Sequence, residues 1–301
     1  MMNSIEIKEL NFSFGSKQIL NKVNLNVPKG SIYGYLGRNG AGKSTTIKLL
    51  LGLLNSKDDN IFLNDLSIKQ DAIKIHSLTG NLIESPCYYT KLTVYENLKY
   101  LDVIYKKGEE RINEVLELVD LLYAAHSKTS NLSMGMKQRL GIAIAIFHDP
   151  EILILDEPLN GLDAQGIYEM RELFLRLNSQ GKTIFLSSHI LSELERVATH
   201  IGIIEGGKMI FEGKKEELLG NVVRKVAIKV SDAEKATTIL ENVRTENNII
   251  HLEIEHDKDF HQKIEKLIQN NIEIYDIQSE TANLEQIFIN LIQPKNDEHI
   301  L

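Results

Sequence analysis

The chain has almost no cysteine and no long apolar run, and both absences limit what it can be. Cys87 is the one cysteine in 301 residues, so a disulfide framework is impossible and a reducing cytoplasm is the expected compartment. We expect Cys87 to be a buried, unreactive thiol. Residues 1–9 lack the apolar core of a signal peptide. No window of about 18 apolar residues exists, so we expect that the chain does not cross a membrane by itself. The net charge of −8 disfavours nucleic acid as a partner, because binding to a phosphate backbone requires positive charge.

The strongest positive feature is a glycine-rich loop at residues 37–45, which reads GRNGAGKST. It fits the pattern G-x-x-x-x-G-K-[ST] of a phosphate-binding P-loop. Residues 31–36 before it are β-prone, and residues 44–54 after it are helical in character, which is the context that the motif requires. Glycines allow backbone N–H groups to face phosphate oxygens, and the helix N-terminus adds a favourable dipole. A glycine turn with a chance lysine is the alternative, and the flanking strand and helix disfavour it.

This loop supplies most of the candidate nucleotide contacts. Lys43 would reach the β- and γ-phosphates of a nucleotide, and the Ser44 hydroxyl would ligate Mg²⁺. Phe14 is a candidate for stacking on the nucleobase, because a flat apolar face binds a π-system without base-specific hydrogen bonds. A core aromatic residue is the alternative there. The candidate contacts within the loop are Gly37, Asn39, Gly40, Gly42, Lys43, Ser44 and Thr45.

Short β-prone runs, broken by glycine and proline, surround the P-loop strand. They predict an antiparallel β-layer that feeds this strand. Pro86 favours a loop over residues 81–86. The predicted strands span residues 5–10, 19–27, 31–36 and 61–63.

Residues 90–147 contain helical patterns and no strand signal, and they predict a helical subdomain. Thr93 and Glu96 form a capping-box pattern at its first helix. Ser133 is predicted to cap a later helix, with Gly135 beside it. A helix N-terminus with an adjacent glycine is a second candidate anion site, and a purely structural cap is the alternative.

A continuous apolar run at residues 152–155 ends in two carboxylates, Asp156 and Glu157. Central parallel strands have this apolar pattern, and ligands gather at their carboxyl ends. Asp156 would hold Mg²⁺, through water, and Glu157 would polarise the attacking water as a general base. Two solvated acids at a strand end are the alternative.

Two further candidates follow this strand. Residues 160–163 predict a tight turn after which Asp163 caps a helix with core residues at helical spacing. Residues 183–186 predict another buried strand, followed by His189, which can hydrogen-bond a γ-phosphate; a capping histidine is the alternative. Residues 201–212 predict a hairpin around two glycines.

The pattern changes near Gly220. The remaining 221–301 predict a small α+β unit of about eighty residues, a usual size for a domain. This unit contains no phosphate loop, metal cluster or nucleophile arrangement, and its sequence does not indicate a role. Its predicted strands are residues 225–230, 249–254 and 272–277, and its predicted helices are residues 232–242, 259–270 and 284–292. A short helix is also predicted before the boundary, at residues 214–219.

Taken together, these motifs resemble the ATP-binding cassette of ABC transporters over residues 5–219. The order matches that family: an aromatic at Phe14, the P-loop, a signature LSMGM at residues 132–136, LDEP at residues 155–158, NGLD at residues 160–163, and His189. The resemblance implies a P-loop NTPase α/β fold over residues 1–220. It would comprise an antiparallel β-layer, a parallel core sheet and a helical subdomain at residues 90–147, followed by the accessory domain 221–301.

The resemblance also implies ligands and partners. ATP and Mg²⁺ would bind, and two copies would pair head to tail around two ATP molecules. Ser133 and Gly135 would contact the γ-phosphate across that interface, and Asp163 would couple the two sites. Separate transmembrane permease subunits would be driven by closure on ATP, with the chain held peripherally at the cytoplasmic face of the membrane. A groove near Glu84 and residues 88–98 would receive a helix of the membrane subunit.

Two motifs depart from the family pattern, the signature and the segment around Glu84. Met134 and Met136 replace a glycine and a glutamine of the signature, while Ser133 and Gly135 are kept, so we expect ATP hydrolysis to survive. Glu84 stands where the family usually has a glutamine. Its carboxylate can still ligate Mg²⁺ and take part in the reaction, but it adds charge near the γ-phosphate and lacks the amide donor. Glu84, LSMGM and the extra C-terminal unit are similar to the subgroup that exports peptide antibiotics, which includes bacitracin-resistance and lantibiotic self-immunity ATPases.

Other functions of an ABC ATPase stay open at this point. A general multidrug exporter would share all the motifs above. A soluble ABC ATPase acting on ribosomes or DNA is disfavoured by the acidic charge and by the lack of a second P-loop or long heptads. A regulatory cassette without turnover is disfavoured by Lys43, Asp156, Glu157 and His189, whereas Glu84 leaves it open.

Overall fold

The computed structural model describes residues 2–188, 191–220, 224–240, 243–254, 257–280, 287–289 and 291. The chain divides into two compact units, Met1–Lys215 and Glu216–Leu301, and each unit has a hydrophobic core of its own. Within the described residues, no helix combines the length and the apolar character that a membrane span requires. His189 and most of the helix predicted for residues 284–292 lie outside the described residues.

The first unit begins with an antiparallel sheet, in the strand order β2-β1-β4-β5. One hydrophobic core joins this sheet to helix α1 (Lys43–Leu50) and to the second sheet, through buried side chains such as Ile7, Ile47 and Ile154. The P-loop helix is therefore fixed by apolar packing on both sheets. The strands are β1 (Asn3–Phe14), β2 (Lys17–Pro28), β4 (Ile61–Leu63) and β5 (Leu66–Ser67).

The second sheet has the strand order β10-β9-β3-β8-β7-β6. Its neighbouring strands are parallel, except that β9 and β10 form an antiparallel hairpin. Parallel pairing brings the carboxyl ends of β3, β8, β7 and β6 to one edge: Leu36 pairs with Ser188, Asp156 with Ser187, and Leu82 with Leu155. The strands are β3 (Ile32–Leu36), β6 (Thr79–Leu82), β7 (Ile152–Asp156), β8 (Thr183–Ser188), β9 (His200–Glu205) and β10 (Lys208–Lys214).

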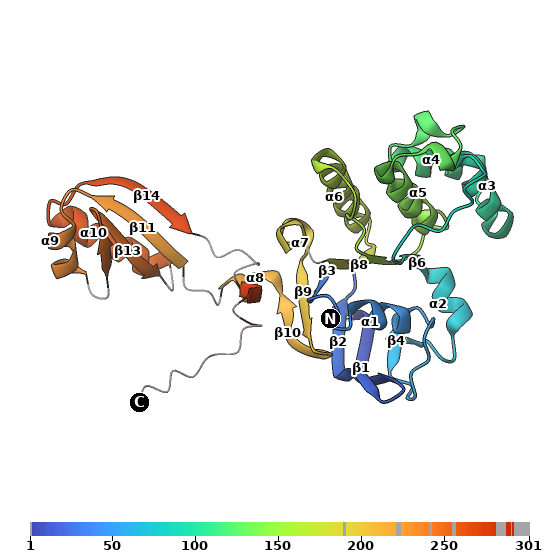
Figure 1. Ribbon diagram of the computed structural model, residues 1–301, viewed down its shortest axis with the longest axis horizontal. Coiled ribbons are helices and arrows are strands. Elements are labelled where there is room, and N and C mark those ends of the chain that lie inside the picture. The colour runs from blue at the N-terminus through green and yellow to red at the C-terminus, as the bar shows by residue number, and fades with distance from the viewer. Residues whose placement is uncertain are drawn as a thin grey trace. The chain divides into compact units, whose positions relative to one another are not determined.

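Helices α3, α4 and α5 gather apart from the first sheet, beyond the β6 side of the second (Figure 1). The capping box at the start of α3 is confirmed, since the Glu96 N–H donates to the Thr93 hydroxyl and the Thr93 N–H donates to the Glu96 carboxylate. The other helices of the first unit are α2 (Ala72–Leu78), α3 (Val94–Tyr105), α4 (Glu109–Leu118), α5 (Met134–Ile146), α6 (Ala164–Ser179) and α7 (Leu191–Val197), with 3₁₀ turns at Leu122–Ala124 and Thr129–Asn131. Helix α8 (Lys215–Gly220) begins at the last residue of the first unit and belongs otherwise to the second.

The second unit is an antiparallel four-stranded sheet in the order β12-β13-β11-β14. Alternate side chains of β11 and β13 are buried against α9 and α10, which cover one face of the sheet. The succession β-α-β-β-α-β is that of the ferredoxin-like, or split βαβ, arrangement. The elements are β11 (Arg224–Val230), α9 (Ala233–Ile239), β12 (Arg244–Glu246), β13 (Ile249–Ile254), α10 (Asp257–Gln269) and β14 (Ile274–Glu280).

Three sequence-based expectations are wrong. Cys87 is exposed, not buried, because it lies in the irregular segment between β6 and α3. The loop predicted over residues 81–86 begins later, since Asn81 and Leu82 complete strand β6, which pairs with β7. Helix α1 ends at Leu50 and not at Leu54.

Candidate functional site

The P-loop runs from the buried strand β3 into α1, and its glycines are required by its geometry. Gly40 and Gly42 have φ values of 83° and 115°, a backbone region that disfavours other residues. A Cβ at Gly37 would lie 2.5 Å from the Ile204 carbonyl oxygen, and one at Gly42 would lie 2.7 Å from Leu20 Cδ2. The loop is therefore packed tightly against its surroundings while its outer rim, Asn39 and Gly40, is exposed.

Lys43 is the buried cation of this loop. Its side chain turns back so that Nζ donates to the Gly37 carbonyl oxygen at 2.6 Å, and only 7% of the residue is exposed. A buried ammonium needs such partners, and phosphate oxygens are stronger acceptors than a carbonyl. Ser44 is exposed and Thr45 is half-buried at the start of α1.

Tyr35 of strand β3 links the sheet to helix α1 through a hydrogen bond. Its hydroxyl lies 3.2 Å from the Thr46 hydroxyl, and both are buried. Burial raises the pKa of Tyr35 well above its usual value, so the phenol stays neutral and available as a donor.

Asp156 and Glu157 stand at the end of β7, on the edge where β3 delivers the P-loop. Asp156 is 4% exposed and accepts a short hydrogen bond from the Ser187 hydroxyl. The same hydroxyl accepts from the Glu157 N–H at 3.0 Å. Glu157 has a φ of 50°, a left-handed conformation that is uncommon for residues other than glycine.

Glu84 lies two residues beyond the end of β6, the strand that pairs with β7. Its carboxylate accepts from Lys48 Nζ of α1 at 2.7 Å. The described residues hold no cluster of three or more His, Cys, Asp or Glu side chains that could bind a metal ion alone. The available oxygens, from Ser44, Asp156 and Glu84, suit Mg²⁺, which binds through one or two carboxylates together with substrate phosphates.

Phe14 ends β1 at the first hairpin and is 53% exposed. Its ring packs edge to face with the Phe12 ring, and the two ring centroids are 4.9 Å apart. An exposed ring face of this kind is open to stacking. His189 lies directly after β8, outside the described residues.

A second group of candidates lies at the N-termini of α5 and α6. The Ser133 hydroxyl accepts from the Met136 N–H at 3.2 Å, and the Asp163 carboxylate accepts from the Gly166 N–H at 2.8 Å, so both residues are N-caps. The two helix starts are adjacent. A Cβ at Gly161 would lie 2.9 Å from Met134 Cγ, and one at Gly135 would lie 3.4 Å from Leu162 Cδ2.

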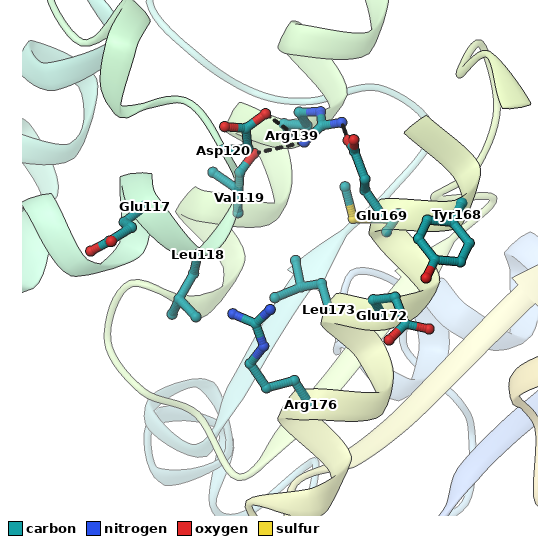
Figure 2. Close-up of a pocket in the computed structure, with 11 residues that line it drawn as sticks. Glu117, Leu118, Val119, Asp120, Arg139, Tyr168, Glu169, Glu172, Leu173 and Arg176 are labelled. Carbon is teal, nitrogen blue, oxygen red and sulfur yellow. Dashed lines mark hydrogen bonds and ion pairs between the residues drawn. The ribbon is translucent and has the colours of Figure 1, made fainter. Parts of the chain in front are cut away.

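Arg139 connects α5 with α6 and with the end of α4. Its guanidinium donates to the Val119 carbonyl at 3.1 Å and forms a close ion pair with Glu169. Figure 2 shows this network among the residues that line a cavity of about 300 Å³, whose lining also includes Leu118, Leu173 and Arg176. Arg139 thereby fixes the orientation of the helix that carries Ser133 and Gly135.

Another cavity, of about 440 Å³, lies on the helical part of the first unit, between β6 and α3 and on α3 itself. Tyr89 and Tyr100 flank it with ring centroids 5.0 Å apart, and each is about half exposed. Buried Asn97 holds the segment in place, because its side chain bonds the backbone N–H and C=O of Tyr89. The lining residues are Tyr89, Thr90, Lys91, Leu92 and Tyr100.

Sequence reasoning missed Ser187, Lys48, Arg139 and Gln138, whose amide donates to the Pro158 carbonyl at 2.9 Å. Ser187 offered a signal, as a polar residue that ends an apolar strand predicted to lie beside Asp156. Lys48 and Arg139 gave none, because their partners are remote in sequence.

Comparisons with known proteins point to one family. The family model described as ABC transporter matches residues 20–160. The bacitracin transport ATP-binding protein BcrA of Enterococcus faecalis is 44% identical over 79% of this chain and 78% of its own length. BcrA of Bacillus licheniformis is 39% identical over 97% of this chain and 98% of its own length. The lantibiotic transport ATP-binding protein SrtF of Streptococcus pyogenes is 42% identical over 73% of this chain and 97% of its own length.

Solved structures agree with this result. The ATP-binding subunit of an ABC transporter matches with a TM-score of 0.66 and 29% identity over 71% of this chain and 91% of that one. The protein cbiO1 of the Clostridium perfringens transporter complex cbiONQ matches with a TM-score of 0.66 and 25% identity over 72% of this chain and 91% of that one. The dimeric post-hydrolysis cassette MJ0796, bound to ADP and Pi, shares the fold with a TM-score of 0.63 and 23% identity over 70% of this chain and 98% of that one. ATPases of this family dimerise and work with transmembrane subunits. The chain belongs to the ABC transporter family and is the ATP-binding, ATP-hydrolysing subunit of such a transporter.

Proposed function

We propose that this ATPase drives export of a peptide antibiotic of the bacitracin or lantibiotic type, and so gives resistance or self-immunity. The similarity to BcrA of Bacillus licheniformis over 97% of the chain carries the proposal, because that match extends through the C-terminal unit and not only through the shared cassette. The relatives at 42–44% identity are likewise named for bacitracin or lantibiotic transport.

In this function the candidate residues of the P-loop and of the neighbouring strand ends each have a role in ATP hydrolysis. Lys43 leaves the Gly37 carbonyl and binds the β- and γ-phosphates. Glu157 accepts a proton from the attacking water as general base, and its backbone is held by Ser187. Ser44, Asp156 and Glu84 would hold Mg²⁺, which when bound neutralises the charge that develops on the phosphates. Phe14 stacks on the base, and His189 contacts the γ-phosphate.

The second group of residues acts on the nucleotide of another copy. Ser133 and Gly135 at the start of α5 offer a helix N-terminus and an exposed hydroxyl to an anion. Since α6 starts beside it, Asp163 is suited to relay the state of one site to the other in a head-to-tail dimer. Each copy then supplies part of the cage around the transferring phosphate.

The cavity flanked by Tyr89 and Tyr100 supports a docking site for a helix of a separate membrane subunit at the cytoplasmic face of the membrane. Half-exposed aromatic residues beside a groove are typical anchors of interfaces. We expect Tyr100→Glu to abolish co-purification with the membrane subunits while ATP binding by the isolated chain is unchanged. Tyr123→Glu is the matched control, because Tyr123 is 75% exposed on the same helical part and lies outside the cavity lining. Equal co-purification of both variants would remove this docking assignment.

The function is tested by growth inhibition. Cells carrying this chain and its membrane partners are exposed to bacitracin and to a panel of lantibiotics, beside a Glu157→Gln control. We expect protection against one peptide, and its loss in the control, in which ATP still binds and dimerisation is strengthened but turnover stops. Unchanged sensitivity to all peptides, with the membrane partners assembled, would refute peptide export in favour of a general exporter. An undiminished rate of phosphate release from Glu157→Gln would remove the general-base role.

A further inference from the structure

An ion pair links the P-loop helix to the turn that follows β6. Lys48, five residues after Lys43 on α1, places its Nζ 2.7 Å from Oε1 of Glu84. The Lys48 side chain is 36% exposed and the Glu84 side chain 64%. The contact joins two segments 36 residues apart in sequence.

The backbone at Glu84 is held in an unusual conformation. Glu84 has a φ of 55°, and the Ser85 N–H donates to the Ile83 carbonyl at 2.6 Å. This hydrogen bond is that of a γ-turn, and a positive φ at its central residue belongs to the rare, strained form. A strained backbone persists only where surrounding contacts enforce it, and it is concentrated at functional positions.

Two helices, α5 and α1, hold this turn in place through contacts with different residues. Pro86 packs on α5 so closely that a Cβ at Gly141 would lie 2.7 Å from Pro86 Cβ. Lys48 of α1 holds the Glu84 carboxylate. The carboxylate is therefore aimed by its turn and its counter-ion, and not left as a freely rotating surface acid.

The Glu84 carboxylate adds negative charge beside Asp156, and the Lys48 ammonium compensates part of it. Leu82 pairs with Leu155 in the parallel sheet, so Asp156 at the end of β7 and Glu84 just beyond the end of β6 lie at neighbouring strand ends. Two carboxylates at the edge that receives a nucleotide repel its phosphates. The Lys48 ammonium compensates one of these charges.

We propose that Lys48 holds the Glu84 carboxylate before nucleotide binds, and that the divalent cation of the bound nucleotide competes with Lys48 for this carboxylate. The inference rests on the proposed role of Glu84 as a metal ligand, and it holds whatever the transported cargo is. An ammonium and a divalent cation both need the lone pairs of the carboxylate oxygens. Because the pair is partly exposed, it is weak enough to open when the cation arrives.

The test is a double-mutant cycle on metal affinity in the full chain. Mn²⁺ binding is followed by electron paramagnetic resonance with saturating β,γ-imido-ATP, for the wild type, Lys48→Met, Glu84→Gln and the double variant. Lys48→Met frees the carboxylate and removes a positive charge, so we expect Mn²⁺ to bind about two- to fivefold more tightly, the range of an exposed ion pair. In the Glu84→Gln background only the loss of the nearby positive charge remains, so the same change should have a clearly smaller effect.

Lys74→Met on α2 is the matched control, because Lys74 is exposed and has no ion pair among the described residues. An equal effect of Lys48→Met with and without Glu84 would overturn the proposal, and so would weaker Mn²⁺ binding in Lys48→Met. The growth assay tests peptide export, whereas the Mn²⁺-binding cycle does not depend on the cargo. Failure of the proposed export function and failure of the Lys48 proposal are therefore distinguishable.

Discussion

Removing the Ser187 hydroxyl tests whether the carboxylate at the end of β7 is held in place by its neighbour strand. Ser187 is fully buried, donates to Asp156 and accepts from the Glu157 N–H. In Ser187→Ala the Asp156 carboxylate keeps its burial and loses that donor. A hydrogen bond to a charged group contributes about 1.5–3 kcal/mol. The Glu157 N–H keeps the Ser187 carbonyl at 3.2 Å as an acceptor, so the loss is concentrated on Asp156.

For a unit the size of Met1–Lys215, 1 kcal/mol shifts the unfolding temperature by about 2–4 °C. We therefore expect Ser187→Ala to lower the unfolding temperature of nucleotide-free protein by about 3–12 °C, measured by calorimetry. Ser179→Ala is the matched control, since that hydroxyl is exposed and bonds only the Arg176 carbonyl; its effect should stay within about 0.5 kcal/mol. If Ser187→Ala unfolds within 1–2 °C (roughly the control range) of the wild type, the hydroxyl does not stabilise the buried carboxylate and the reasoning is wrong.

Three further predictions concern contacts around α5. Gly80→Ala should destabilise the first unit by about 1–3 kcal/mol in urea unfolding, because its Cβ would lie 2.0 Å from the Ala145 carbonyl oxygen; a smaller loss would show that α5 moves away freely. Arg139→Ala, which removes the Glu169 ion pair and a backbone hydrogen bond, should cost about 1–3 kcal/mol, and an unchanged urea midpoint would contradict this. Burial lowers the pKa of His148, so the unfolded chain binds more protons and stability should fall as the pH drops below about 6.5; His148→Asn should show a smaller fall, and identical pH profiles would refute the assignment.

Local signals predicted the parts of the fold that local interactions determine. The capping box at Thr93 and the caps at Ser133 and Asp163 were predicted because a cap uses a side chain and an N–H two or three residues away. The strand and helix that flank the P-loop and the hairpin of β9 and β10 were also predicted from local signals, because glycines at fixed spacing specify the loop or turn that joins the two elements.

Elements whose state depends on remote partners were not predicted. Strand β6 has one large apolar residue, Leu82, and becomes a strand by pairing with β7 and by letting Gly80 lie under α5. Strand β12 consists of the exposed residues 244–246 and depends on pairing with β13. Likewise, the sequence identified Glu84 as unusual but could not reveal Lys48, because no spacing rule connects a helix residue to a turn 36 positions later.

Ser133 shows why one sequence signal cannot separate a structural cap from a phosphate contact, and a paired substitution can. Its hydroxyl accepts from the Met136 N–H, which leaves the O–H free to donate to an anion. Asp caps a helix as well as Ser does and is favoured by the helix dipole, but its carboxylate has no proton to donate at pH 7 and repels phosphate. Ser133→Asp should therefore keep the unfolding temperature while ATP hydrolysis is lost, whereas Ser133→Ala should lose about 1 kcal/mol of stability. Full hydrolysis by Ser133→Asp would mean that Ser133 is a cap alone and that the anion is bound elsewhere.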